Sequence, residues 1–375
     1  MISPKKFIIS ISLLCLATSL FGQEGEAWNS FRGNPALQGT ASTGLQNSYK
    51  LLWTFKMGDE TKSSPIINQY GIYVGSNDGF LYCISLSGKL LWKYATGSAI
   101  ESPPLFLEKT IYFSTLEGIM YALDAATGKL KWKFSTEGQI SGAANYFLNS
   151  KNRAMIIFGS YDYSLYCLEA ATGSKIWTYT TENYINGSPA NNGKQTVFGG
   201  CDGQLHVFDI LKGKLIRKVD MGTYIASSAS LEGNMAYLGN YDGNFFAVDF
   251  VNNRIKWKHE GAGPFTGSPA ISGNKIVIGS QDRTIYCFNK SDGKVFWTFK
   301  TLGKIDGSPV IAGSNVVIAS GDGRIYIVDI NTGKEIWKYD MASPSASTPA
   351  VTKNFLIISC LDGNVFAFGP KQKTK

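Results

Sequence analysis

The stretch Val277–Trp297, VIGSQDRTIYCFNKSDGKVFW, recurs in eight variants along a chain of 375 residues. It returns as VGSNDGFLYCISLSGKLLW at Val74–Trp92 and as ASGDGRIYIVDINTGKEIW at Ala319–Trp337. Each copy holds a pair of small residues, an acidic turn, an aromatic-rich strand, a Gly turn and a closing position that is usually Trp. The acidic position occurs in steps of 39, 45 and then five times 40 residues, at Asp78, Glu117, Asp162, Asp202, Asp242, Asp282, Asp322 and Asp362. A fixed period of this length indicates a tandem array of one supersecondary unit.

Each unit divides into four short segments without helical spacing. In the sixth unit the predicted strands are Ser268–Ile271, Lys275–Gly279, Thr284–Phe288 and Lys294–Phe299. β-Branched and aromatic residues fill them, and Asp-Gly or a related pair turns the chain between the second and third strands. Four strands in about 40 residues, repeated eight times, predict an all-β protein: an eight-bladed β-propeller with four-stranded blades.

The two ends of the array predict how the ring closes. Leu51–Phe55 is a Trp-bearing strand with no unit of its own, and the last unit stops after its third strand, Asn364–Phe368. Pairing these two strands would complete the eighth blade and remove the open sheet edges. The predicted propeller therefore spans 51–368, with a lead-in segment at 23–50 and a basic C-terminal tail at 369–375.

A Trp closes seven of the eight aligned units. We expect these side chains to be structural and to pack between neighbouring blades, where each would remove about 150–250 Å² from water. They are Trp53, Trp92, Trp132, Trp177, Trp257, Trp297 and Trp337. Arg217 takes the position in the remaining unit. Its stem would cover the same surface while its charge reaches solvent, which makes the fourth blade the expected weak seam.

Residues 1–22 have the composition of a signal peptide. Lys5 and Lys6 form a charged start, and the apolar run Phe7–Leu16 is too short to span a membrane comfortably. Cleavage is expected after Gly22, with Ala17–Ser19 as the alternative site. The sequence therefore predicts an exported bacterial protein, periplasmic, at the cell surface or secreted, with no transmembrane segment in the mature chain.

Cys15 would be a lipid anchor only if a lipobox preceded it. Leu14 stands where a lipobox has a small residue, and Cys15 lies inside the apolar run. A soluble exported protein is therefore favoured over a lipoprotein.

The exported chain carries a mild positive charge. Of the 36 basic residues, Lys5 and Lys6 lie in the leader, so 34 remain against 28 acidic residues and the formal charge is +6. The charges are spread along the chain, and no basic run interleaves with aromatic residues in one place. This pattern argues against a nucleic-acid partner.

The cysteines of the exported chain are expected to be buried thiols without a structural disulfide. Cys83, Cys167 and Cys287 share one repeat position, which other units fill with Ala, Val or Ile. A position that accepts these residues is small, apolar and buried. Export favours disulfides in general, but the three units concerned are not neighbours.

Three further patterns are not assigned a ligand-binding role. The acidic residues are expected to cap their own turns through bonds to the backbone, and not to form a Ca²⁺-binding crown. His206 and His259 have no partner at ligand spacing, so no metal site is predicted. Gly187–Lys194 has one residue too many for a phosphate loop and lies in a predicted hairpin, so it is not assigned that role.

One position in each repeat varies inside a constant frame, nine residues after each Trp position and just before a Gly/Ser-Ser-Pro run. It lies in a loop on the same predicted face as the acidic turns. We predict that these side chains form a recognition ring around the pore mouth; the alternative is that they are solvated loop residues. They are Lys62, Glu101, Ser141, Asn186, Ala226, Thr266, Asp306 and Ala346. Tyr161 and Tyr241, which precede acidic turns, are predicted partner contacts, because exposed Tyr is enriched in interfaces.

The pattern G-S-x-D-G-x-[LI]-Y-x-x-D-x-x-T-G-K-x-x-W resembles the repeat of the pyrroloquinoline-quinone (PQQ)-type propellers. The resemblance covers residues 51–368, and Trp28-x-x-Phe31-Arg32-Gly33-Asn34 is similar to the segment that often precedes the first blade in that family. Some members are quinoprotein alcohol dehydrogenases that carry PQQ and Ca²⁺. Others bind no cofactor, among them a propeller lipoprotein of the outer-membrane β-barrel assembly machinery.

The residues favour the branch without a cofactor. The adjacent Cys pair typical of the large dehydrogenases is absent, and the one expanded unit, around Asn145–Ala154, is expanded on the face opposite the acidic turns. The resemblance then implies a non-enzymatic binding or scaffold protein of the bacterial cell envelope. It would present its loop faces to a protein or polymer partner, as in outer-membrane protein assembly, with no catalytic residue, metal or cofactor.

Two alternatives remain open at this point. The first is a small PQQ-dependent oxidoreductase with PQQ and Ca²⁺ at the pore mouth, where Glu101 or Asp306 would act as base or Ca²⁺ ligand. The second is a saccharide-binding protein that uses exposed aromatic side chains.

Overall fold

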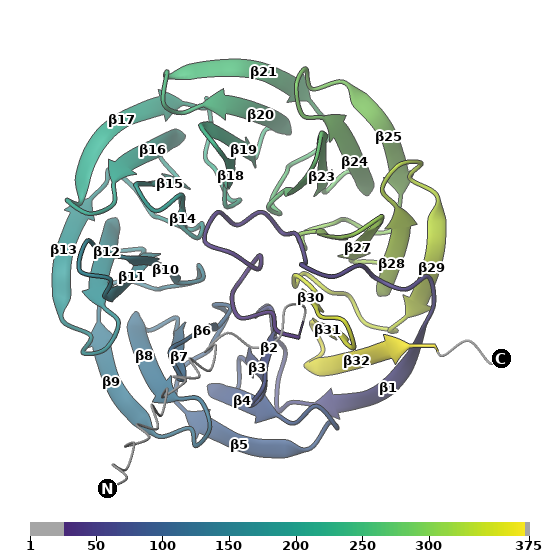
Figure 1. Ribbon diagram of the computed structural model, residues 1–375, viewed down its shortest axis with the longest axis horizontal. Coiled ribbons are helices and arrows are strands. Elements are labelled where there is room, and N and C mark those ends of the chain that lie inside the picture. Colours follow the sequence, from purple (N-terminus) through teal and green to yellow (C-terminus); the bar gives the residue numbers. More distant parts are fainter. Residues whose placement is uncertain (1–25, 372–375) are drawn as a thin grey trace, which may run out of the picture.

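The computed structural model describes residues 26–371, which contain 32 β-strands in eight four-stranded antiparallel sheets. The sheets stand around a central pore as blades, and the first strand of each blade is the innermost (Figure 1). The predicted eight-bladed β-propeller is confirmed. No helix within the described range is long and apolar enough to cross a membrane.

The strands of the first four blades follow one another in chain order from the pore outward. Blade one holds β2 (Ile66–Asn68), β3 (Gly71–Gly75), β4 (Phe80–Ile84) and β5 (Leu90–Ala95). Blade two holds β6 (Leu105–Leu107), β7 (Thr110–Ser114), β8 (Ile119–Asp124) and β9 (Leu130–Ser135). Blade three holds β10 (Asn145–Leu148), β11 (Ala154–Gly159), β12 (Ser164–Glu169) and β13 (Lys175–Thr180). Blade four holds β14 (Ala190–Asn191), β15 (Gln195–Gly199), β16 (Gln204–Asp209) and β17 (Lys214–Asp220).

The remaining blades repeat this order. Blade five holds β18 (Ser230–Glu232), β19 (Met235–Gly239), β20 (Asn244–Asp249) and β21 (Arg254–Glu260). Blade six holds β22 (Ala270–Ser272), β23 (Lys275–Gly279), β24 (Thr284–Asn289) and β25 (Val295–Lys300). Blade seven holds β26 (Val310–Ala312), β27 (Asn315–Ala319), β28 (Arg324–Asp329) and β29 (Glu335–Asp340). Blade eight holds β30 (Ala350–Val351), β31 (Leu356–Ser359), β32 (Asn364–Pro370) and β1 (Tyr49–Lys56).

The ring closes in blade eight as predicted. β1 is the outermost strand of this blade and pairs antiparallel with β32, with Trp53 opposite Ala367. The pairing runs from Tyr49 opposite Pro370 to Lys56 opposite Asn364, so the paired strands extend slightly beyond the predicted bounds of 51 and 368. The predicted leader at 1–22 and the last four residues of the predicted tail lie outside the described residues.

Six of the seven repeated Trp side chains pack on the turn between the third and fourth strands of the next blade, and Trp337 packs on Tyr49 and Phe368 of blade eight. The ring of Trp257 in blade five lies over Gly293 of blade six, and its Nε1 donates to the carbonyl oxygen of Lys290 at 3.0 Å. A Cβ at Gly293 would lie 2.6 Å from this ring, and φ at this residue is +73°. The Gly in this turn is therefore required both by its backbone conformation and by the Trp that covers it.

Arg217 differs from its prediction. Its Nη1 donates to the carbonyl oxygen of Val251 in the next blade, and its Nε is buried without a partner. The guanidinium therefore lies in the seam, where it takes over the hydrogen bond of the Trp Nε1, and does not simply reach solvent. Asn253 occupies the place of the turn Gly with φ of +52°, a left-handed conformation that Asn tolerates better than most other residues.

The lead-in segment forms a plug across one end of the pore. We call Trp28–Leu45 the pore plug, because its backbone pairs with one innermost strand after another (Figure 1). Carbonyl oxygens of the plug accept from main-chain N–H groups or, in blade three, from the Asn145 side chain. The donors are Ile67, Phe106, Asn145, Asn191, Leu231, Ile271 and Ile311 in blades one to seven; six of them occupy equivalent positions, and Asn145 stands one residue earlier in its blade. The plug thereby satisfies pore-facing groups on seven inner strand edges.

Arg32 fixes the plug from its centre. It is fully buried, and its two terminal nitrogens donate to the carbonyl oxygens of Pro269 and Pro309 in blades six and seven. Burial lowers the pKa of the Arg32 guanidinium to about 9. Gly39 leaves the space that this side chain fills, since a Cβ there would lie 2.0 Å from Nη2.

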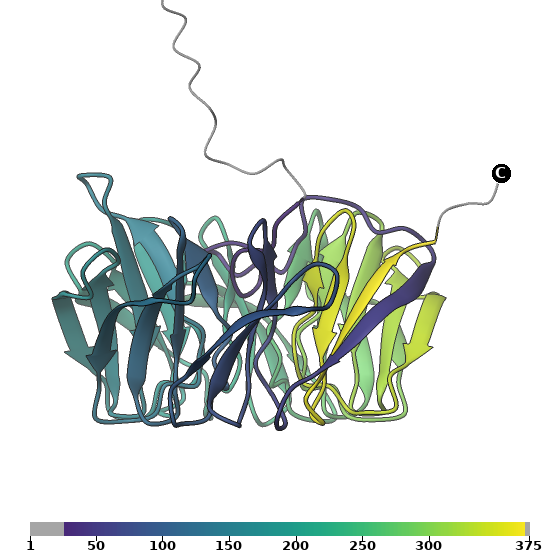
Figure 2. The same ribbon diagram turned by 90° about the horizontal axis from the view of Figure 1, so that it is seen from below.

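The two faces of the disk are now distinct. The face that carries the pore plug also carries the turns between strands one and two and between strands three and four, and both ends of the described chain leave from it (Figure 2). We call it the plug face. The opposite face carries the eight acidic turns, and we call it the acidic-turn face.

Candidate binding face

The acidic-turn face is built from two loops in each blade. One is the acidic turn between strands two and three, and the other is the loop that enters the blade from the preceding one. In every blade a backbone N–H of the acidic turn donates to a carbonyl oxygen of the entering loop, as Tyr241 donates to Tyr224 at 3.2 Å. The prediction that both loops lie on one face is therefore confirmed.

Six acidic turns are capped as predicted. In blade six, Oδ1 of Asp282 accepts from the Thr284 backbone at 2.8 Å and Oδ2 accepts from the Tyr286 hydroxyl at 2.5 Å. The six capping residues are Asp78, Asp162, Asp202, Asp282, Asp322 and Asp362. Since their oxygens are used inside the blades, these carboxylates stabilise the turns.

Glu117 and Asp242 depart from this prediction. In blade five, Oδ1 of Asn240 accepts the turn N–H of Asn244, and in blade two the Thr115 hydroxyl accepts that of Ile119. The side chain two residues before the acid has taken over the capping role in both blades. Asp242 is left exposed on the acidic-turn face.

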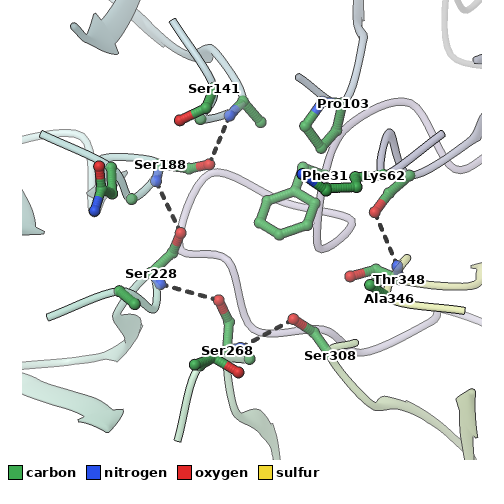
Figure 3. Close-up of a pocket in the computed structure, with 18 of the residues that line it drawn as sticks. Phe31, Lys62, Pro103, Ser141, Ser188, Ser228, Ser268, Ser308, Ala346 and Thr348 are labelled. Carbon is green, nitrogen blue, oxygen red and sulfur yellow. Dashed lines mark hydrogen bonds between the residues drawn. The ribbon is translucent and has the colours of Figure 1, made fainter. Parts of the chain in front are cut away.

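The predicted recognition ring lies around a funnel at the pore mouth (Figure 3). All eight ring positions line this cavity, which has a volume of about 200 Å³. Phe31 of the pore plug forms its floor, so the pore does not run through the protein. The sequence suggested the ring but not the floor, because the lead-in lies outside the repeat.

Serine hydroxyls tie neighbouring blades together in the funnel wall. The backbone N–H of Ser188 donates to the Ser228 hydroxyl at 2.8 Å, and Ser228 donates in the same way to Ser268 at 3.1 Å (Figure 3). Ser268 continues to Ser308 at 2.9 Å. These bonds come from the constant Ser-Pro or Ser-Ser part of each repeat, so the frame of the funnel is rigid while the ring positions differ.

The charged ring residues are paired. Nζ of Lys62 lies 2.7 Å from Oε1 of Glu101, and Nζ of Lys304 lies 2.9 Å from Oδ2 of Asp306. Oδ1 of Asp306 also accepts from the Thr266 hydroxyl and from the Gln281 amide. The carboxylates are more buried than the lysines, with side-chain exposures of 18% and 24% against 55% and 62%. The funnel wall therefore has acids inside and lysines at its rim.

Asn186 is the ring residue with unused bonding capacity. Its Nδ2 lies 3.0 Å from the Cys201 sulfur, and its Oδ1 is buried without a partner. Cys201 is half-buried and the other four cysteines of the described residues are buried; all five are free thiols. Burial raises the pKa of the Cys83 and Cys167 thiols to about 12, so they are protonated and inert at neutral pH.

Five tyrosines form an arc beside the funnel, on blades three to five. Tyr184 packs against Tyr161 and Tyr163 at ring distances of 5.0 and 5.1 Å, and Tyr224 stacks on Tyr241 at 4.4 Å. Tyr163, Tyr184 and Tyr241 are each about two-fifths exposed. We call these five residues the tyrosine arc. Burial, followed by the bond to Tyr241, raises the pKa of Tyr224 to about 12, so Tyr224 is uncharged at neutral pH.

Three members of the tyrosine arc were not predicted. Tyr161 and Tyr241 were singled out from the sequence, whereas Tyr163, Tyr184 and Tyr224 were not. Tyr184 and Tyr224 stand two residues before the ring position, and this column of the repeat also varies between units. The same search for variation inside a constant frame would have found them.

The residues at the pore mouth can bind polar and aromatic groups, but they do not form a metal centre. Within residues 26–371, no three His, Cys, Asp or Glu side chains gather in a group that could hold a metal ion. His206 is buried, with Nε2 at 2.8 Å from Oδ2 of Asp202. It takes the place that Tyr286 has in blade six, and so belongs to the turn structure.

Comparisons with known proteins give two family matches. Residues 144–375, more than half of the chain, match a family model described as the β-propeller of β-alanine-activating enzyme. Residues 43–156 match the family model of the outer membrane protein assembly factor BamB. No curated protein matches this chain.

Several solved structures share the fold. BamB from Moraxella catarrhalis superposes with a TM-score of 0.73 at 19% identity, over 88% of this chain and 99% of that one. The computationally designed protein Ika8 gives 0.75 at 17% identity, over 86% and 100%. A europium-containing methanol dehydrogenase gives 0.77 at 12% identity, over 93% and 99%. Identities this low establish a common propeller and leave the activity to be argued from the site.

Proposed function

The chain belongs to the PQQ-type repeat β-propeller family, and from that premise we propose that it is a non-catalytic docking protein of the bacterial cell envelope. It would bind a protein partner through its acidic-turn face and act in the assembly of outer-membrane proteins. The match to the assembly-factor model and the likeness to BamB support this assignment. The predicted leader at residues 1–22 is consistent with export.

The observation that carries the proposal is the tyrosine arc. Exposed tyrosines are enriched in protein interfaces, because each offers a large rigid surface and a hydroxyl at low conformational cost. Here they are concentrated on three adjacent blades of one face. The arc borders a funnel whose side chains vary while its frame is constant, so the same face offers both contact area and specificity.

The residues at the funnel do not fit PQQ with Ca²⁺. PQQ is a flat polyanion, and the funnel of about 200 Å³ is smaller than the roughly 300–1,000 Å³ typical of ligand pockets. Glu101 and Asp306, the two candidate Ca²⁺ ligands, are each paired with a lysine. Phe31 closes the pore below them. No reaction step is therefore assigned to this protein.

The test is a double substitution in the tyrosine arc, Tyr184→Ala with Tyr241→Ala, introduced into a strain that lacks the native protein. We expect folded outer-membrane β-barrel proteins to fall to the level of the deletion strain, because interface tyrosines are common binding hot spots. Leu302→Ala is the matched control. Leu302 is 73% exposed on the same face, in the loop entering blade seven, away from the arc.

The result has to separate loss of binding from loss of fold. The double variant should melt within a few degrees of the native protein, since both substituted tyrosines are half-exposed surface side chains. Unchanged β-barrel levels in the double variant would refute the docking role of the arc. Retained quinone absorbance and alcohol oxidation after addition of PQQ and Ca²⁺ would instead establish the oxidoreductase.

A further inference from the structure

The outer strands of the propeller carry a repeated basic and apolar pattern on the plug face. At the start of six consecutive outer strands, from blade eight through blade five, an exposed Lys or Arg stands directly before an exposed aliphatic side chain. The basic residues are Lys50, Lys89, Lys129, Lys175, Lys214 and Arg254, which we call the basic rim. In the part of the chain that the structure describes, none of these six lies within 4.0 Å of a carboxylate.

The aliphatic side chains that follow the basic rim are unusually exposed for their size. Leu90, Leu130 and Ile176 keep 45%, 46% and 50% of their surface accessible, and Leu91 keeps 52%. They stand at the start of the outer strands, beside the turns between strands three and four, so they are exposed at the same level of the disk as the rim charges. Lysine and arginine next to exposed aliphatic groups form the pattern of proteins that lie on an anionic lipid surface.

The two remaining blades interrupt the pattern. Lys294 in blade six is 3.8 Å from Asp292, and in blade seven Lys334 is followed by Glu335. The unpaired charges therefore occupy a continuous arc of the disk, not its whole circumference. The hairpin between β10 and β11, enlarged relative to every other unit, adds exposed Leu148 and Lys151 to the same face, within this arc (Figure 2).

The acidic-turn face has the opposite charge. Each of its eight turns between strands two and three carries a carboxylate, and Arg283 is the one basic residue within those four-residue turns. An anionic surface would attract one face of the disk and repel the other. Such a charge distribution orients a protein as well as binding it.

We propose that the plug face docks on an anionic lipid surface through the basic rim and its aliphatic neighbours. The inference does not depend on the proposed function, but the two fit together, because the tyrosine arc would then face away from the lipid. A lipid surface accounts for the pattern better than a nucleic acid does. Nucleic-acid binding through a basic stripe needs no exposed aliphatic side chain beside each charge.

The test measures partitioning of the purified exported protein onto vesicles of phosphatidylcholine with and without phosphatidylglycerol. We expect binding only to the anionic vesicles, weakened as salt rises from low concentration to about 0.15 M. The variant Lys89→Glu, Lys129→Glu, Lys175→Glu should bind at least about 100-fold more weakly, from about five-fold for each charge removed. Lys56→Glu, Lys133→Glu, Lys300→Glu is the matched control, since it makes the same charge change nearer the acidic-turn end of the outer strands.

A second variant separates a lipid surface from a general polyanion site. Leu90→Ser, Leu130→Ser, Ile176→Ser keeps every charge, and it should lower vesicle binding by about ten-fold if these side chains enter the interface. The proposal would be overturned if the protein does not bind anionic vesicles, or if the three Lys→Glu substitutions in the basic rim leave that binding unchanged. Equal binding to double-stranded DNA with no effect of the serine substitutions would also overturn it.

A measurement on the native protein covers the case in which a variant does not fold. Hydrogen exchange with anionic vesicles present should protect the turns between strands three and four in blades one to five and the start of β1 in blade eight. The turns between strands two and three should exchange as they do in free solution. Protection of the acidic-turn face instead would mean that the lipid binds that face and not the plug face, and it would refute the proposal.

Discussion

The plug face and the acidic-turn face are made by the same eight repeats, yet they differ in what their side chains do. On the plug face the constant Trp rings of the repeat cover its Gly turns, and Arg32 of the pore plug, which lies outside the repeat, donates to the carbonyl oxygens of two blades. On the acidic-turn face the constant residues form a frame of capped turns and serine bonds. Within that frame the ring and the tyrosine arc vary from blade to blade.

This difference shows how a repeat protein separates stability from specificity. Contacts between blades recur at each seam, so they have to be made by residues that every unit shares. Recognition needs asymmetry, which only the variable positions can supply. Substitutions near the plug face should therefore lower the free energy of unfolding, and substitutions at the acidic-turn mouth should affect binding with little effect on stability.

The largest effect is expected at a Trp seam. Trp257→Ala removes a ring packed on Gly293 and the donor to the Lys290 carbonyl oxygen, and it should lower the free energy of unfolding by about 3–5 kcal/mol. Arg217→Ala, at the same position in blade four, should cost only about 1–2 kcal/mol, because less apolar surface is lost. Urea unfolding followed by circular dichroism measures both; equal losses would refute the idea that blade four is the weaker seam.

The second largest loss of stability is expected from a substitution in the pore plug. Arg32→Ala leaves the carbonyl oxygen of Pro309 without its side-chain donor and that of Pro269 with only the Ser230 hydroxyl, and we expect a loss of about 2–4 kcal/mol after allowing for relief of the buried charge. Arg32→Lys should restore only part of this, since an ammonium lacks the planar fork. Lys353→Ala, an exposed basic residue of the same face, serves as the control. A stable Arg32→Ala protein with an open pore would show that the plug is dispensable.

Charges at the funnel should matter little for folding. Glu101→Ala with Asp306→Ala removes two partly exposed ion pairs, so the free energy of unfolding should change by less than about 1 kcal/mol while partner binding weakens. Asp282→Ala on the same face is the contrast. It removes the acceptor for the Thr284 backbone and the Tyr286 hydroxyl, and it should destabilise by about 1–2 kcal/mol. A larger loss in the funnel variant than in Asp282→Ala would make the ring structural.

The smallest effect is a pH dependence from His259. Burial lowers the pKa of His259, which packs against Tyr286 and Phe288. The unfolded chain then takes up a proton at a higher pH than the folded one, so stability should decline as pH falls below about 6.5. In His259→Phe this part of the acid sensitivity should be absent, as thermal melts between neutral and mildly acidic pH would reveal. If the pH profile of His259→Phe equals that of the native protein, groups other than His259 cause the acid sensitivity.

Most of the fold could be predicted because its determinants are local and repeated. The predicted strands of blade six agree with β22 to β25 within about two residues. The closure of blade eight followed from one unpaired strand at each end of the array. Turn chemistry was also visible, since Asp-Gly and Thr-Gly-Lys have specific backbone requirements.

The pore plug could not be predicted, because its partners are distant in sequence and are mostly backbone groups. Nothing in Phe31 or Arg32 shows that one lies under the funnel and the other donates to carbonyl oxygens more than 200 residues away. A single Arg in a polar segment is expected to be solvated. The ring residues were found because the repeat alignment places them in one column, and the same alignment contains Tyr184 and Tyr224 without marking tyrosine as special.

The most direct test of the division between the faces is photo-crosslinking in living cells from one position on each. A photoreactive side chain at Tyr184 lies on the acidic-turn face, and one at Leu211, which is 47% exposed, lies on the plug face. We predict a protein adduct from Tyr184 that contains a component of outer-membrane protein assembly, and none from Leu211. Protein adducts from Leu211 alone would contradict the account, because the partner would then bind the face that we assign to stability and to lipid.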